Sequence, residues 1–372
     1  MATERPKVDI DDQTCCDLIE QLVSIESHSE NEAAAVQFLV KQFQQLGYDE
    51  AYVDDAGNAV GIRGSASAET TVVLLGHIDT VPGNPPVRIE NGILHGRGSV
   101  DAKGPLATFA IAGAQTHLPS PQCRLVVIGA VEEESATSKG ARQAAIDFQA
   151  DYCVIGEPSS SKAITLGYKG RVLIDFEISL AMSHTAGPGR GAAEPVSDVW
   201  QFVHQYCTRY NESQPKLFDQ MLNSLRSINS SSDGLASHGN CKIGIRLPLN
   251  FDIQAFEKQL REFCDAIPEV VDGTKYSLRF YGHEKAHRSN RSNPLCQAMA
   301  SALRELGIKP GYKVKTGTAD MNVVAPIWQC PILAYGPGDS SLDHTPQEHL
   351  YLDEYLEAIQ VLTLALNRLK IG

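Results

Sequence analysis

The chain alternates between amphipathic stretches and short runs that are almost wholly apolar. The apolar runs cover 71–75, 123–131 and 152–155, and each leads into glycine or charged residues. Such runs are typical of strands buried in a parallel sheet. Helices are predicted around them at 12–25, 31–46, 105–114 and 138–148. Because strands and helices take turns, this part of the chain is predicted to form a doubly wound α/β sheet.

From Val172 onward, apolar and polar residues alternate, which predicts half-exposed antiparallel strands. Strands are predicted at 172–180, 241–247 and 275–282, helices at 192–210 and 251–266, and a flexible turn at 230–237. This order fits a β-α-β-β-α-β unit of the ferredoxin-like type. We therefore predict an inserted α+β domain at 171–284.

The α/β pattern returns after residue 293. Helices are predicted at 294–306 and 352–369, and strands at 312–315 and 330–335. A length of 372 residues also favours two domains over a single core. The predicted fold class is α/β, with a three-layer domain built from 1–170 and 285–372 and interrupted by the α+β insert.

Composition narrows the function classes. A net charge of −13 argues against nucleic acid and against an anionic membrane surface as partners, and more weakly against an acidic protein, because a local basic patch can still exist. No apolar run is long enough to span a bilayer, and no signal peptide is visible at the N-terminus. Nine cysteines without CxxC pairs indicate free thiols in a reducing cytosol, so we expect a cytoplasmic protein.

Histidines and acids gather where predicted strands and loops end. They are His77, Asp79, Asp101, Glu133, Glu134, Glu157 and His344. In open α/β sheets, ligands bind beyond the carboxyl ends of the strands. Imidazoles and carboxylates without cysteine describe a site for cations that prefer nitrogen and oxygen ligands. The acids exceed the needs of one ion, so we expect two divalent cations that activate a water molecule and polarise a carbonyl group.

Each of these residues has a purely structural alternative. The alternatives are a hydrogen-bonded pair for His77 and Asp79, a helix cap for Asp101, a surface charge for Glu157 and a turn cap for His344. The acidic run 132–134 could be a solvated charged segment. That alternative is less attractive at a strand end, because adjacent carboxylates repel one another unless cations neutralise them.

Five motifs in order carry a family resemblance. They are GHIDTVPG at 76–83, GRGSVDAKG at 96–104, EEE at 132–134 followed by SATSKG, GEP at 156–158 and DHTP at 343–346. Together they resemble the ArgE/DapE-type dinuclear zinc metallopeptidase and deacylase family, and the resemblance covers nearly the whole chain. The stretches KTGTADMNVVAP and YGPGDSSLDHTPQEHL are most similar to the acetyl-lysine and acetylornithine deacetylase branch.

The resemblance implies a role for each residue at the site. It implies that His77 and Glu157 bind one zinc ion, that Glu134 and His344 bind the other, that Asp101 bridges the two ions, that Asp79 orients His77, and that Glu133 is the general base. Glu132 then lies outside the ligand set. Cobalt is an alternative to zinc.

The resemblance also makes residues 171–284 a lid and dimerisation domain. His184 is expected to reach the active site, from the partner subunit in dimeric members, and to stabilise the oxyanion. Arg246 is expected to pair with the substrate carboxylate, and Gly317 and Thr318 to line the substrate pocket. This chain departs from the family pattern in the glycine-rich loop after His184 and in TGTAD, where SGGTD is usual. A polar loop histidine and an exposed strand arginine are the alternatives.

The expected activity is removal of an acyl group, acetyl above others, from an N-acyl amino acid such as N-acetyl-lysine or N-acetylornithine. Three alternatives of the same family stay open: a dipeptidase or carboxypeptidase, a desuccinylase, and release of an amino acid from an acidic carrier protein. A binding protein with a dead site is disfavoured because all five ligand positions are intact. The expected partners are a small-molecule substrate and a second copy of the chain, without nucleic acid or membrane.

Overall fold

The computed structural model describes residues 10–117, 122–184, 186–187 and 189–369. The chain divides into two compact units. The first unit contains 1–167, 288–314 and 319–372, and the second contains 168–287 and 315–318. The second unit thus takes in a short segment, 315–318, that the sequence pattern places with the α/β domain.

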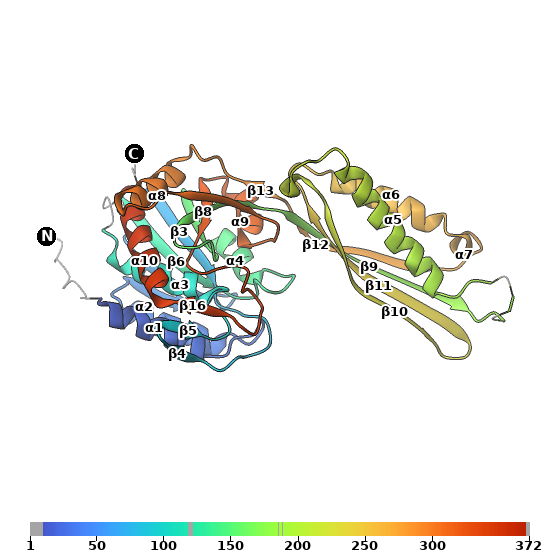
Figure 1. The fold of residues 1–372 in the computed structure, drawn as a ribbon, viewed down its shortest axis with the longest axis horizontal. Coiled ribbons are helices and arrows are strands. Elements are labelled where there is room, and N and C mark those ends of the chain that lie inside the picture. The colour runs from blue at the N-terminus through green and yellow to red at the C-terminus, as the bar shows by residue number, and fades with distance from the viewer. Residues whose placement is uncertain (1–9, 118–121, 185, 188, 370–372) are drawn as a thin grey trace. The chain divides into compact units, whose positions relative to one another are not determined.

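The first unit is organised around a nine-stranded mixed sheet (Figure 1). Its strands run in the order β1-β2-β6-β3-β7-β15-β8-β13, and β14 also pairs with β8. The bounds are β1 Glu50–Val53, β2 Ala59–Arg63, β3 Thr70–His77, β6 Cys123–Ala130, β7 Tyr152–Gly156, β8 Ala163–Tyr168, β13 His287–Arg288, β14 Gly311–Lys315 and β15 Ile332–Tyr335. Strands β6, β3, β7 and β15 are parallel neighbours, as their apolar runs predict.

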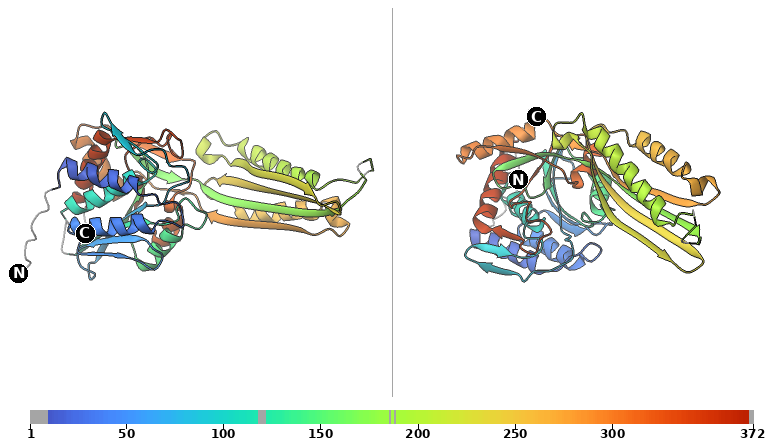
Figure 2. Two further views of the ribbon diagram at one scale, coloured as in Figure 1. Left: turned by 90° about the horizontal axis from the view of Figure 1, so that it is seen from below. Right: turned by 45° about the vertical axis from the view of Figure 1, so that its right-hand side comes forward.

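Helices cover both faces of this sheet, which makes three layers (Figures 1 and 2). Their bounds are α1 Asp12–Ser24, α2 Ala33–Gln45, α3 Lys103–Gln115, α4 Lys139–Asp147, α8 Pro294–Glu305, α9 Asp320–Trp328 and α10 Leu352–Asn367. One large core joins α1, α2, α3, α8 and α10 to the sheet residues of one face, among them Val72, Leu74 and Val127. Helices α4 and α9 pack against each other on the opposite face. Alternate residues of each strand therefore serve different layers.

A second, small sheet in the first unit joins a strand near the C-terminus to a hairpin within 82–98, a segment whose glycines, prolines and asparagines predict a loop or a hairpin. It has the order β16-β5-β4, with β4 Arg88–Glu90, β5 Ile93–His95 and β16 His349–Tyr351. Three-residue strands give too little alternation to detect. Helix α9 was also not predicted, since Pro326 lies inside it and glycines precede it.

The second unit is a four-stranded antiparallel sheet in the order β10-β11-β9-β12. Its elements are β9 Gly170–Ala181, α5 Ala193–Asn211, β10 Leu222–Ser232, β11 Ala236–Leu247, α6 Ile253–Asp265, the short α7 Pro268–Val271 and β12 Tyr276–Glu284. This is the β-α-β-β-α-β order of a ferredoxin-like unit. The predicted turn at 230–237 is too long, because strands β10 and β11 extend into it and leave a tight hairpin.

Among the described helices, none is both long enough and apolar enough to cross a membrane. All nine cysteines are free thiols, and seven of them are buried.

Candidate metal centre

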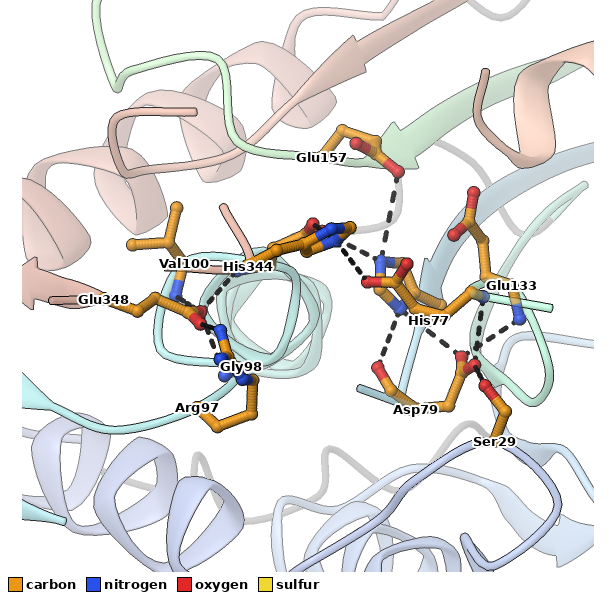
Figure 3. A network of polar contacts seen from close by, with 12 residues as sticks. Ser29, His77, Asp79, Arg97, Gly98, Val100, Glu133, Glu157, His344 and Glu348 are labelled. Carbon is orange, nitrogen blue, oxygen red and sulfur yellow. Dashed lines mark hydrogen bonds and ion pairs between the residues drawn. The ribbon is translucent and has the colours of Figure 1, made fainter. Parts of the chain in front are cut away.

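The centre lies where three neighbouring parallel strands end. Strand β3 ends at His77, β7 ends one residue before Glu157, and β6 ends just before the run that contains Glu133 and Glu134. Because parallel strands place their carboxyl ends at the same edge, these side chains meet without any special turn. Loops bring Asp101 and His344 to the same place, and Figure 3 shows His344 beside His77.

The orientation of the buried His77 ring is set by the chain that follows it. Its Nδ1 lies 3.0 Å from the Asp79 carbonyl oxygen, which can only accept, so Nδ1 carries the proton. Nε2 in turn donates to Asp101 Oδ1 at 3.2 Å and lies 4.0 Å from Glu157 Oε1, so a bound cation would take the place of the Nε2 proton. An imidazole fixed in this way is prepared to bind a cation through Nε2.

Asp101 stands between the two histidines. Its Oδ1 lies 3.2 Å from His77 Nε2, and its Oδ2 lies 3.1 Å from His344 Nε2. His344 Nε2 also lies 2.9 Å from Glu134 Oε1. One carboxylate therefore offers one oxygen to each histidine, which is the arrangement that a bridging ligand of two cations requires.

Asp79 holds the acidic run rather than facing the open side of the centre. Its two carboxylate oxygens accept hydrogen bonds from the backbone N–H groups of Glu133 and Glu134, each at 3.0 Å. The Ser29 hydroxyl donates a further bond of 2.6 Å to Asp79. Asp79 thus connects His77 with the backbone of Glu133 and Glu134, and these contacts fix the three residues relative to one another.

The three glutamates of the run point to different neighbours. Glu132 accepts from the Thr137 hydroxyl at 2.6 Å and lies 3.8 Å from Lys139 Nζ. Glu134 faces His344. Glu133 has a ligand atom within 4.8 Å of those of His77 and Glu157. The left-handed backbone of Glu132, with φ of 59°, turns the chain at the point where the strand ends.

The electrostatics of the centre show that cations fit it. Burial raises the pKa of Glu133 well above its usual range, and Glu157 adds to the increase. Hydrogen bonds to Asp101 and Glu134 raise the pKa of His344 to about 10. Neighbouring carboxylates contribute to both shifts: the acids at the centre carry more negative charge than the nearby histidines neutralise, so protonated forms are favoured. Two groups of ligand atoms, His77 with Glu133 and Glu157, and His77 with Asp101 and Glu134, are close enough to hold a metal ion.

Glu348 is a site residue that the sequence analysis missed. It is buried, and its Oε1 accepts from the backbone N–H groups of Gly98, Val100 and Asp101 at 2.9–3.1 Å. Its Oε2 pairs with the Arg97 guanidinium at 2.6 Å. Glu348 therefore holds the loop that presents Asp101, and Figure 3 shows it beside Arg97, Gly98 and Val100 of that loop. The sequence offered one signal for this role, namely an acidic residue in DHTPQEHL only four positions after the proposed ligand His344.

The predicted substrate residues belong to the second unit. Arg246 in β11 donates a 2.6 Å hydrogen bond from Nη1 to the Thr318 hydroxyl, so these two predicted residues do meet. Gly317 precedes Thr318 in the same segment. His184 lies exposed in the loop after β9, and its Nδ1 accepts from the backbone N–H of Ala186 at 3.1 Å. Their roles toward a substrate remain predictions.

The chain is similar to a known protein family and to several proteins with names. The family profile described as peptidase family M20/M25/M40 matches residues 73–368. A LysW-lysine hydrolase of Deinococcus radiodurans is 47% identical over 368 residues, which cover 97% of this chain and 99% of the relative. A putative LysW-lysine/LysW-ornithine hydrolase of Thermococcus kodakarensis is 37% identical over 354 residues, covering 95% of this chain and 92% of the relative.

A solved structure has the same fold. The M20 family metallo-carboxypeptidase Sso-CP2 of Sulfolobus solfataricus superposes with a TM-score of 0.75, covering 95% of this chain and 98% of the other. The identity is 16%, so this likeness concerns the fold alone.

Proposed function

The chain belongs to peptidase family M20/M25/M40 and is a hydrolase, and from this premise we propose that it releases lysine from an amide link to the carrier LysW. The observation that carries the proposal is the relative at 47% identity over almost the full length of both chains, whose name states that reaction. Ornithine is the second candidate amino acid, because the relative from Thermococcus kodakarensis is named for both. Carrier release thus has better support than deacetylation of a free N-acetyl amino acid.

The overall charge is a poor guide to such a partner, because basic residues are unevenly distributed. Between residues 285 and 315 the chain has seven lysines and arginines and a single acidic residue. In the first unit, Arg288 and Arg291 line a hollow of about 400 Å³. Lys313 donates from Nζ to the Ser159 carbonyl at 2.9 Å, two residues beyond Glu157. Basic side chains of this segment therefore lie both at the hollow and beside the loop of a proposed ligand, which suits an acidic carrier.

Each proposed ligand fits a two-ion arrangement. His77 and Glu157 would hold one divalent ion, Glu134 and His344 the other, and Asp101 would bridge them. Bound ions of this kind lower the pKa of a water molecule and polarise a carbonyl group. We propose zinc, with cobalt as the alternative, because imidazole and carboxylate ligands suit both.

Glu133 would be the general base of the reaction. It stands beside His77 and Glu157, and burial raises its pKa, so it can take a proton from the nucleophile and return it to the leaving amine. Asp79 positions this glutamate through its backbone N–H. Arg246 and Thr318 would bind the carboxylate of the amino acid, and Gly317 would line the pocket beside them. We further propose that His184 stabilises the oxyanion and that the second unit serves as lid and as dimer contact.

A substrate panel tests the function. The purified protein with added zinc is given LysW carrying lysine, LysW carrying ornithine, N-acetyl-lysine, N-acetylornithine, succinylated amines and dipeptides, and the released amino acid is quantified by chromatography. We expect the carrier-linked lysine to have the highest kcat/KM. A higher kcat/KM for N-acetyl-lysine or for a dipeptide would refute carrier release and leave the hydrolase assignment intact.

A further inference from the structure

Two histidines stand directly opposite each other on the small sheet, away from the centre described above. His95 of β5 pairs with His349 of β16 in an antiparallel register, and their ring centroids are 5.5 Å apart. The neighbouring pair, Leu94 and Leu350, is completely buried. Because strand residues alternate between faces, both imidazoles lie on the outer face of this sheet, and both are partly exposed.

A hydrogen bond fixes the tautomer of the neutral His349 ring and its orientation. Its Nδ1 lies 2.7 Å from the Gln347 carbonyl oxygen, so Nδ1 donates and Nε2 keeps its lone pair. The Tyr351 ring packs edge-on against it, with centroids 5.5 Å apart. A backbone carbonyl that fixes the tautomer in this way is the usual outer partner of a metal-binding histidine.

We propose that His95 and His349 form a surface site for a divalent transition-metal ion, zinc above others, that is separate from the two-ion centre. With Zn–N bonds of about 2.0–2.1 Å and tetrahedral angles, two imidazole rings on one ion have centroids about 5 Å apart, which the observed spacing nearly matches. Water fills the remaining positions of the ion. Imidazole nitrogen also suits copper, cobalt and nickel, so these ions compete for the site.

The charged residues around His95 and His349 do not prevent a cation from binding between the two rings. Arg88 lies opposite His95 on β4, but its guanidinium is paired with Glu90 at 3.0 Å. Partial burial, together with Arg88 and His349, lowers the pKa of His95, while Glu90 acts in the opposite direction; the net shift favours the neutral imidazole that coordinates a metal ion.

An ion at this position would join the two strands that lead into the catalytic loops. The chain runs from His95 into the loop of Asp101, and His349 follows Glu348, which holds that loop. The Gly96 N–H donates to the Glu348 carbonyl at 3.3 Å, directly beside the histidine pair. Binding therefore stabilises the β5–β16 pairing, and we expect excess zinc to raise the melting temperature of the holoenzyme.

Equilibrium dialysis tests the site. The holoenzyme and the variants His95→Gln, His349→Gln and His117→Gln are dialysed against increasing zinc, and bound zinc per chain is counted by atomic emission. His117 is an exposed histidine of the first unit and serves as the matched control. We expect wild type and His117→Gln to bind one more zinc ion per chain than either His95→Gln or His349→Gln. The zinc-dependent rise in melting temperature should disappear in the same two variants.

Equal zinc content in all four proteins would overturn the proposal, and so would loss of zinc in only one of the two site variants. His95 and His349 both lie on a partly exposed sheet face, so neither substitution should disrupt the core. Wild-type rates of hydrolysis at limiting zinc would show that the variants are folded. Copper used as the probe gives a second readout, since its electron paramagnetic resonance spectrum shows coupling to two nitrogens in wild type and should lose it in the variants.

Discussion

Arg97 and Glu348, 251 positions apart in the sequence, form a buried ion pair with 2.6 Å between Nη1 and Oε2. The other oxygen of Glu348 accepts three backbone N–H groups, the last of them from Asp101. The pair therefore connects the C-terminal part of the first unit to the loop that presents the proposed bridging carboxylate. We therefore expect the ion pair to stabilise the fold and to fix the position of Asp101.

We expect Glu348→Ala to destabilise the protein by about 3–5 kcal/mol, because it leaves a buried arginine without its partner. Metal affinity should fall as well, since the backbone of Asp101 loses its acceptor. Chemical denaturation and chelator competition measure the two effects. Glu305→Ala, which removes the surface ion pair with Arg368, is the control and should cost at most about 1 kcal/mol. Equal losses in both variants would contradict the role of Glu348.

Adjacent glutamates allow a matched test of the general base. Glu133→Gln should lower kcat by about 10²–10⁴-fold while the metal content stays the same, as removal of a general base does. Glu132→Gln should keep nearly full activity, because Glu132 contacts Thr137 and Lys139 instead. The checks are kcat on the best substrate and metal per chain. Full turnover in Glu133→Gln would exclude this residue as the base.

Asp79→Asn tests whether the Asp79 carboxylate, which lies beside His77 and holds the backbone of Glu133 and Glu134, matters for metal binding. The amide cannot accept through both of its terminal atoms, so the N–H group of Glu133 or of Glu134 loses its acceptor. We expect metal affinity to fall by about 10–100-fold, the usual effect of losing an outer partner of a metal ligand. Competition with a chelator measures it. Ser29→Ala removes only one bond to Asp79 and should have a smaller effect; an unchanged affinity in Asp79→Asn would refute the positioning role.

Removal of the metal should make the stability of the protein depend on pH in a defined direction. In the metal-free centre the pKa of His344 is raised to about 10. A raised histidine pKa contributes stability that is fully present below about pH 6.5 and is lost as pH rises toward 10. The raised pKa of Glu133 acts in the same direction, because its neutral form is the favoured one in the fold.

We therefore expect the melting temperature of the metal-free protein to fall between about pH 6.5 and 10 more steeply than that of the holoenzyme. His344→Asn should flatten the curve of the metal-free protein. Calorimetry with and without chelator provides the comparison. Identical pH profiles for the two forms would contradict the excess of negative charge at the centre.

Charge reversal on the basic segment tests carrier binding. Arg288→Glu with Arg291→Glu should raise KM for LysW carrying lysine by about tenfold or more and make it less dependent on salt, because attraction across the interface is lost. The same variant should hydrolyse a small amide substrate as wild type does. Lys41→Glu, on the exposed side of α2, is the control. An unchanged KM for the carrier substrate would show that the carrier binds elsewhere.

Much of the fold could be predicted from the sequence because its signals are local. Apolar runs such as 71–75 and 123–131 identify buried parallel strands, and alternation after Val172 identifies the antiparallel unit. The strand β16 and the helix α9 gave no such signal, because a three-residue strand and a helix with an internal proline show no clear periodicity. The strands β4 and β5 lie in 82–98, where the turn residues predict only a loop or a hairpin.

The sequence by itself also determined which residue types stand at the strand ends, and hence that histidines and carboxylates would meet at one sheet edge. Only the tertiary structure decided which of their atoms face each other: Asp101 with one oxygen toward each histidine, and Glu348 beneath its loop. The physical reason is that secondary structure follows from neighbours within a few residues. Contacts such as those of Glu348 join segments about 250 positions apart, and they arise only when the layers pack.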